Sequence, residues 1–248
     1  MRRLLSVAVL AVTLASCHPR GPIATPPAAG PPAGAPAAAA TAEPPGITWV
    51  RSSAEYEAAT RQAYRIAGEK VAAAAAGRAP GTWAVVLDAD ETVISNVVYQ
   101  AERARAGMGY TAESWDAWVR REAATPVPGA AEFLADVRAR GGRIAIVTNR
   151  LGSQCAATEA VFRRDALVFD AMLCRPDGAP SDKAPRFDAV AAGATSGGRP
   201  VEILAFLGDN ILDFPGLQPS ARGTGADGFA SFGERYFLLP NPMYGSWQ

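Results

Sequence analysis

The residues V-V-L-D-A-D-E-T, from Val85 to Thr92, constrain the fold of this chain more than any other segment. They complete a run of β-strand formers and end it with two aspartates, Asp88 and Asp90. In an extended segment, side chains two positions apart point the same way, so both carboxylates should project from the C-terminal end of one strand. Open α/β sheets bind their ligands at that end. Two carboxylates aimed at one point repel unless a cation or proton lies between them, and Mg²⁺ prefers such oxygen ligands.

A simpler interpretation of these two aspartates stays open at this point. A buried strand can also end in a polar turn, in which Asp90 or Thr92 caps the helix that follows. Such a turn needs no metal, and it predicts no particular residues elsewhere in the chain. The choice between a helix cap and a metal site therefore depends on what the other strand ends carry.

Beyond this segment, apolar runs alternate with helical patterns. Strands are expected at 83–87, 143–148, 168–173, 201–207 and 235–239, with helices at 129–140, 153–164 and 181–192. This alternation predicts an α/β fold: a Rossmann-like, mostly parallel sheet with helices on both faces. A capping box at Ser52 predicts an earlier helix that reaches Gly77. The helical stretch from about 97 to 124 predicts a small helical cap, within about 96–127.

The N-terminus has the pattern of a targeting segment. Basic residues precede an apolar core, Leu4 to Leu14, that is too short to span a bilayer, and the core ends in L-A-S-C at Cys17. This pattern resembles a bacterial lipobox, in which Cys17 is acylated; an ordinary secretory signal with an incidental cysteine is the alternative. A lipid-anchored protein of the cell envelope is expected, at the outer membrane and facing the periplasm or exterior. The expected division is a signal peptide at 1–16, a Pro/Ala-rich tether at 17–46 and a folded domain at 47–248.

Composition excludes several kinds of chemistry. Basic and acidic residues number 24 each, so no bulk charge attracts a nucleic-acid polymer, and none is expected as a partner. The one histidine, His18, precedes the expected domain, which argues against Ser-His-Asp hydrolysis, phosphohistidine chemistry and histidine-rich zinc sites. An enzyme in this domain would have to use carboxylates, a lysine and an oxygen-bound metal. Cys155 and Cys174 could form a disulfide or remain free thiols.

Three further polar groups follow the later strands. The second strand ends in Thr148 and Asn149, which could hold phosphate oxygens or cap a helix. Lys183 stands at the start of a helix, where the helix dipole disfavours a cation unless an anion is nearby; a solvated surface lysine is the alternative. The fourth strand ends in G-D-N-I-L-D, with Asp209 and Asp213 within reach of one metal or in a plain polar turn.

Taken in this order, the four motifs resemble those of the haloacid dehalogenase superfamily. The closer resemblance is to its class C acid phosphatases, bacterial lipoproteins that include 5′-nucleotidases. The similarity covers the whole mature domain, and the segments that carry it are 88–99, 114–119, 126–134, 147–150, 181–187, 208–214 and 232–247. One departure is Ala89, where the family usually has Ile or Leu. That side chain is expected to face away from the metal and to leave the chemistry unchanged.

The resemblance implies a role for each matching residue. Asp88 is the expected nucleophile, and Asp90 the expected general acid and base. Mg²⁺ is the expected cofactor, held by Asp88, by the backbone carbonyl of Asp90 and by Asp209, with Asp213 in support. The residues expected to hold the phosphoryl oxygens are Thr148, Asn149 and Lys183. Arg150 is not included in the catalytic set.

The expected reaction is hydrolysis of a phosphomonoester or nucleotide by an acid phosphatase or 5′-nucleotidase. Tyr110, Trp115 and Tyr244 are candidates to stack against a nucleobase, whereas Trp118 is expected to pack in the core. The alternative function is an inactive surface lipoprotein that binds a nucleotide or phosphate. A receiver-type phosphate acceptor is a third possibility, which the export signal and the second aspartate disfavour.

Overall fold

The computed structural model describes residues 42–248 of the chain. The predicted signal peptide, Cys17 and the tether up to residue 41 lie outside this range, so the predictions made for them are not tested by the fold. The first helix, α1 (Pro45–Ser52), begins two residues before the expected start of the domain and buries Ile47 and Val50. No helix within residues 42–248 combines the length and apolarity needed to cross a membrane.

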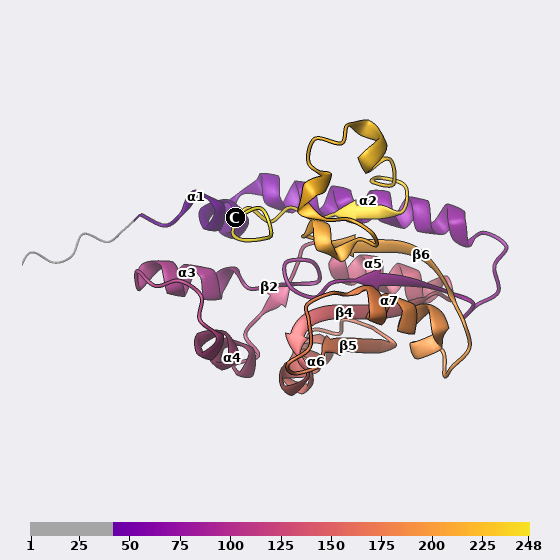
Figure 1. Cartoon of the computed structure of the whole chain (residues 1–248), viewed down its shortest axis with the longest axis horizontal. Helices are drawn as coiled ribbons and strands as arrows, with labels where there is room; N and C mark the ends of the chain where they lie inside the picture. The colour runs from indigo at the N-terminus through magenta and orange to yellow at the C-terminus, as the bar shows by residue number, and fades with distance from the viewer. Residues whose placement is uncertain (1–41) are drawn as a thin grey trace, which may run out of the picture. The chain divides into compact units, whose positions relative to one another are not determined.

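Five parallel strands form the sheet, which confirms the expected α/β fold (Figure 1). Their order is β5 (Ala171–Arg175), β4 (Arg143–Leu151), β1 (Trp83–Leu87), β6 (Glu202–Gly208) and β7 (Tyr236–Leu238). The central strand β1 is buried along its whole length because it has a neighbour on each side and apolar layers above and below. This position explains why its sequence is uninterrupted by polar residues.

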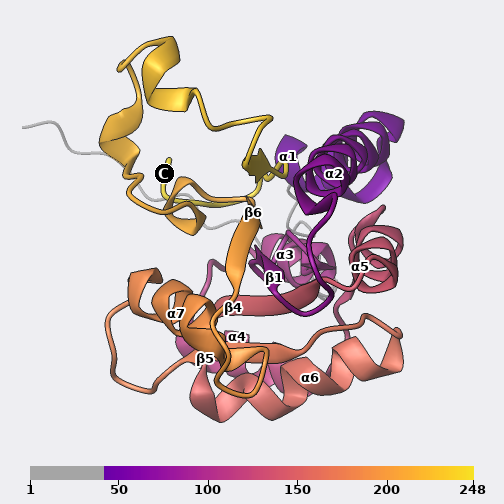
Figure 2. The same cartoon turned by 90° about the vertical axis from the view of Figure 1, so that its right-hand side faces the viewer.

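Helices cover both faces of the sheet. Side chains of α2 (Ala54–Ala75), α5 (Ala130–Ala139) and α6 (Cys155–Arg164) form one apolar cluster with Val85 and Leu87 of β1. Alternate residues of the same strand pack against α7 (Ala184–Ala189) and the short π-helical turn η2 (Val190–Ala194) that continues it. Figure 2 shows α2 and α5 lying side by side, and the rings of Tyr64 and Phe133 pack between them.

The helical stretch expected from about 97 to 124 is helical but interrupted. Two helices occupy it, α3 (Val97–Arg105) and α4 (Ala112–Arg120), and an unpredicted two-stranded ribbon of β2 (Ile94–Ser95) and β3 (Thr125–Pro126) closes the insert at its base. Gly107, with φ of 64°, ends the first helix, and Thr111 with Ser114 forms the capping box that starts the second. Trp118 is buried as expected, at 2% exposure.

Smaller differences from the predicted elements have local causes. The cap of α2 is Ser53 rather than Ser52, because Ser52 is the last residue of α1. Strand β5 begins at Ala171, three residues later than predicted. The two cysteines left open by the sequence form a disulfide, which joins the start of α6 (Cys155) to β5 (Cys174).

Candidate active site

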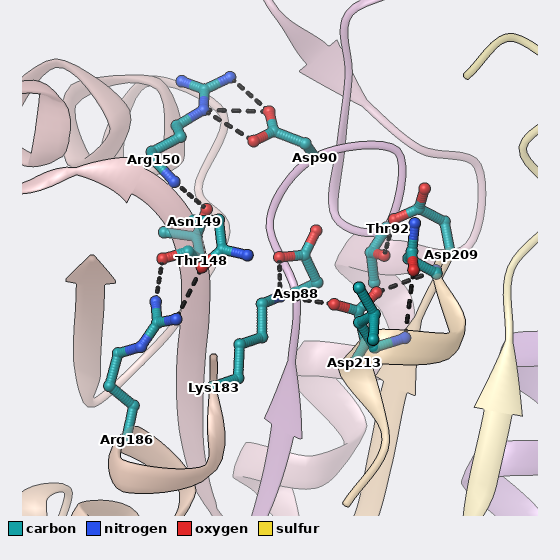
Figure 3. A network of polar contacts seen from close by, with 12 residues as sticks. Asp88, Asp90, Thr92, Thr148, Asn149, Arg150, Lys183, Arg186, Asp209 and Asp213 are labelled. Atoms are coloured by element: carbon teal, nitrogen blue, oxygen red, sulfur yellow. Dashed lines mark hydrogen bonds and ion pairs between the residues drawn. The ribbon is translucent and has the colours of Figure 1, made fainter. Parts of the chain in front are cut away.

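The carboxyl ends of the central strands bring the predicted site residues to one edge of the sheet (Figure 3). Asp88 directly follows β1, Asp209 directly follows β6, Asn149 lies near the end of β4, and Lys183 is the N-cap of α7. Parallel strands end at the same edge, so Asp88 and Asp209 meet there although they are 121 residues apart in the sequence. These four residues line one cavity of about 690 Å³.

Three aspartates form the acidic part of this site. Carboxylate oxygens of Asp88, Asp209 and Asp213 all lie within 4.8 Å of one another. Asp213 accepts a hydrogen bond from the backbone N–H of Asn210 at 2.9 Å, and Asp209 accepts one from the Asn241 side chain at 2.8 Å. These contacts aim the carboxylates at a common point. The sequence indicated all three aspartates but gave no reason to single out Asn241.

Lys183 is buried among these carboxylates, as expected for a helix-start lysine with an anion nearby. Its ammonium donates to Asp88 Oδ1 and, at 2.6 Å, to Asp213 Oδ1. Burial alone would lower the pKa of Lys183, but Asp213 and Asp88 outweigh it and raise that pKa above its usual value. The solvated-surface alternative is therefore excluded, because Lys183 is only 5% exposed.

One lysine against three carboxylates leaves an excess of negative charge in the acidic cluster. Burial raises the pKa of Asp88 to about 7, although Lys183 opposes the rise. Burial together with Asp213 also raises the pKa of Asp209 well above its usual value. Closely spaced, partly uncompensated carboxylate oxygens are a donor set that suits a hard divalent cation, so the residues present fit Mg²⁺.

The carboxylate of Asp90 does not join the acidic cluster, contrary to the expectation that it and Asp88 share one point. Arg150 Nη2 donates to Asp90 Oδ1 at 2.7 Å, and the buried guanidinium holds the aspartate away from the cluster (Figure 3). The alternation rule fails here because the strand ends at Leu87 and the backbone turns at Ala89, whose carbonyl accepts from the backbone N–H groups of Val93 and Ile94. Asp90 still lines the cavity. The helix-cap alternative is also excluded, since the N-cap of α3 is Asn96.

Two arginines that the sequence did not assign to the site organise the end of β4. Arg150 is 3% exposed and lines the cavity; its guanidinium lies 5.3 Å from the ring centre of Trp115. Arg186 donates to the Thr148 carbonyl oxygen and, at 2.6 Å, to Asn149 Oδ1. It also donates to the carbonyl of Asp182, which fixes the loop before Lys183 against β4.

Thr148 lies deeper than expected for a residue that holds phosphate. Its side chain is fully buried, its hydroxyl accepts from the Arg150 backbone N–H at 3.1 Å, and it is not among the residues that line the cavity. Asn149, the next residue along β4, does line the cavity. The regular pairing of β4 with β5 ends at Thr148, which pairs with Cys174, and resumes with a shifted register at Leu151, so Asn149 and Arg150 belong to the irregular segment that borders the cavity.

The three predicted aromatic residues all line the same cavity. Tyr110 is 67% exposed, and its ring centre lies 6.3 Å from that of Trp115 on the cap. Tyr244 approaches from the C-terminal segment, and its hydroxyl donates to Oε2 of the buried Glu91. Tyr244 therefore has a structural hydrogen bond as well as a ring that borders the cavity.

Comparisons with known proteins agree with this geometry. Residues 34–247 match the family described as HAD superfamily, subfamily IIIB (Acid phosphatase). The chain is 31% identical to the class C acid phosphatase from Bacillus anthracis, with a TM-score of 0.72 over 82% of this chain and 84% of that one. The same Bacillus anthracis enzyme with tungstate bound matches at 30% identity and a TM-score of 0.72, with the same coverage. The family and the enzyme class predicted from the sequence are thus confirmed: the chain belongs to subfamily IIIB of the haloacid dehalogenase superfamily, and it is a phosphomonoesterase of the acid phosphatase type.

Proposed function

We propose that this acid phosphatase depends on Mg²⁺ and works through an aspartyl-phosphate on Asp88. The observation that carries the proposal is the position of the Asp88 carboxylate. It follows the central strand and lines the cavity, it accepts from the Lys183 ammonium, and one of its oxygens lies within 4.8 Å of oxygens of Asp209 and Asp213. A carboxylate that attacks an anionic phosphate needs a positive charge nearby. The Lys183 ammonium, and a cation held by the aspartates, can supply that charge.

The reaction proceeds in two displacements. An oxygen of Asp88 attacks phosphorus, and the bond from phosphorus to the ester oxygen breaks. The electron pair of that bond stays on the leaving oxygen, which takes a proton from the carboxyl group of Asp90. Asp90 is then ionised and removes a proton from a water molecule as that water attacks phosphorus. The bond to Asp88 breaks, and inorganic phosphate and the free carboxylate result.

The residues around Asp88 would provide both a cation site and an oxyanion site. Asp88, Asp209 and Asp213 would hold Mg²⁺, which when bound offsets the repulsion between the nucleophile and the phosphate. Lys183 and Asn149 line the cavity and would hold the phosphoryl oxygens; Thr148, fully buried, would support them from beneath. The related Bacillus anthracis enzyme binds tungstate, an oxyanion, which supports an oxyanion site in this fold.

The substrates that we propose are nucleoside monophosphates and other phosphomonoesters with a flat leaving group. Tyr110 and Trp115 on the cap and Tyr244 on the C-terminal segment border the cavity and could stack on a base. The protein would meet these substrates in the cell envelope. There we propose a lipid anchor at Cys17 that holds the domain at the outer membrane, facing the periplasm or exterior.

The test is turnover of p-nitrophenyl phosphate and of nucleoside monophosphates by the mature protein, with Mg²⁺ and after chelation by EDTA. We expect activity with Mg²⁺, loss of activity with EDTA, and recovery when Mg²⁺ is added back. Asp88→Asn, which keeps the shape of the side chain, should reduce turnover to background in a folded protein. Binding of nucleotides without any turnover would instead favour an inactive binding protein, and full activity after exhaustive chelation would contradict the metal site.

A further inference from the structure

Asn96 is a fully buried amide that the proposed reaction does not use. It lies at the start of α3, where the motif after β1 meets the cap. Its Nδ2 donates to Asp90 Oδ1 at 2.8 Å and to Glu91 Oε2 at 3.0 Å. Its Oδ1 accepts from Trp118 Nε1 at 2.8 Å and from Arg150 Nη2 at 3.1 Å. All of its side-chain hydrogen-bonding capacity is therefore used inside the protein.

The partners of Asn96 allow the amide only one orientation. Asp90 Oδ1 also accepts from Arg150, and Glu91 Oε2 also accepts from the Tyr244 hydroxyl, so both oxygens act as acceptors, whereas an indole N–H and a guanidinium can only donate. If the amide were flipped by 180°, its oxygen would face the two carboxylate oxygens and its NH₂ group would face the two N–H donors. All four hydrogen bonds would then be lost in a buried site, where unpaired polar groups are costly. The side chain of Asn96 is thus held in one orientation. The backbone N–H of Asn96 also donates to Glu91 Oε1, at 2.6 Å.

The two oxygens of Asp90 differ sharply in their surroundings. Oδ1 accepts from Asn96 Nδ2 at 2.8 Å and from Arg150 Nη2 and Nε at 2.7 and 3.0 Å. Oδ2 has one longer contact among residues 42–248, at 3.2 Å from Arg150 Nε. Asp90 lines the cavity and its side chain is 19% exposed, so one of its oxygens can meet the reacting group. Oδ2 is the oxygen left free to exchange a proton.

We infer that Asn96 is a positioning residue for proton transfer. It holds Asp90 by Oδ1, together with Arg150, so that Oδ2 gives the proton to the leaving oxygen and later takes one from water. Trp118 locks the amide from the cap, so the orientation of the acid and base depends on the docking of α4. This inference rests on the proposed function, in which Asp90 carries the proton.

The leaving group of the substrate provides the test, because p-nitrophenolate departs readily without a proton and an alkoxide does not. Asn96→Asp keeps the shape and the acceptor facing Trp118 but removes both donors to the carboxylates. The parameter kcat/KM reports the first displacement, in which the leaving group departs. General acid catalysis typically contributes 10²- to 10⁴-fold, so we expect about a 10- to 100-fold loss for an alkyl phosphate and less than about 3-fold for p-nitrophenyl phosphate.

Trp118→Phe provides a second variant in case Asn96→Asp does not fold. It keeps an aromatic ring in the core but removes the N–H that fixes the amide, so a smaller loss with the same dependence on leaving group is expected. Trp83→Phe is the matched control, because Trp83 is also fully buried and its Nε1 has no partner within residues 42–248. We expect the Trp83 variant to treat both substrates alike.

The outcomes separate this inference from the proposed function. If the wild-type protein turns over neither substrate, the phosphatase reaction itself is refuted. If the wild type is active but folded Asn96→Asp and Trp118→Phe lose equal activity on both substrates, or lose none, Asn96 has only a structural role. A loss confined to the alkyl phosphate, absent in Trp83→Phe, supports positioning of Asp90.

Discussion

Replacing the nucleophile by its amide should make the metal-free protein more stable at high pH, even though it removes activity. Asp88 is 8% exposed and lies beside two other carboxylates, with Lys183 as its counter-charge. Burial raises the pKa of Asp88 to about 7 from its ordinary value of 3.8, which means that the folded protein resists ionisation of this group. Asp88→Asn removes the group that has to ionise.

The size of the effect follows from the pKa shift. For a carboxyl group whose pKa is higher in the folded state, the stabilisation is complete below the unfolded pKa and is lost as pH rises through the folded pKa. The free energy of unfolding should therefore fall between about pH 4 and pH 7, by about 1.4 kcal/mol per pH unit for one proton. The total reaches about 4 kcal/mol above pH 7 as an order of magnitude. Glu91, whose pKa is also raised to about 7 by burial, contributes a second, independent loss in the same window.

Urea unfolding of wild type and Asp88→Asn from pH 4 to 8, in EDTA and in Mg²⁺, provides the assay. In EDTA the two proteins should be similar at pH 4, and the variant should be the more stable by pH 8, with a shallower slope. Mg²⁺ should restore most of the wild-type stability, because a bound cation contributes about 2.7 kcal/mol at one hundred times its Kd. The reasoning fails if the variant is equally destabilised at every pH, or if Mg²⁺ stabilises both proteins equally.

Three other perturbations have defined outcomes. Replacing both Cys155 and Cys174 by Ser removes a disulfide that spans a sequence separation of 19, so the free energy of unfolding should fall by about 3 kcal/mol and the thermal unfolding temperature should fall with it. Wild-type protein whose disulfide has been reduced should show the same decrease. Tyr244→Leu should lower kcat/KM for a nucleoside monophosphate about 5- to 150-fold and leave kcat/KM for small aliphatic phosphates unchanged. Tyr244→Phe, which keeps the ring, should lower stability but keep the preference for nucleotides. Equal losses on all substrates would refute the stacking role. Cys17→Ser should abolish acylation, and finding no acyl mass on the wild-type mature protein in a mass spectrum would refute the anchor.

The sequence was sufficient to predict where the acidic cluster forms. Asp88, Lys183 and Asp209 each follow an apolar strand or open a helix, and the carboxyl ends of parallel strands necessarily meet at one edge. No side-chain detail was needed for that conclusion. The five-stranded sheet and the two covered faces followed from the same alternation of strands and helices.

What the sequence could not give is the direction of side chains beyond the strand ends. The carboxylate of Asp90 turns to Arg150 because the backbone after Leu87 is not extended, and no periodic pattern reveals such a turn. Arg150 and Arg186 are buried, but this arginine-rich chain offers no sign of which arginines leave the surface. Asn96 and Trp118 meet only because the cap folds back on the motif. Each of these contacts depends on tertiary packing rather than on local sequence.

The central claim is that phosphate passes through a covalent bond to Asp88, and acid-quenched mass spectrometry tests it most directly. Asp90→Asn lacks the base for the second displacement, so with p-nitrophenyl phosphate and Mg²⁺ it should accumulate the phosphoenzyme. Digestion at low pH should then place one phosphoryl group on the peptide that contains Asp88. Asp88→Asn should show no phosphorylated peptide and no turnover. Turnover by a folded Asp88→Asn protein, or a phosphoryl group on a different residue, would contradict the account.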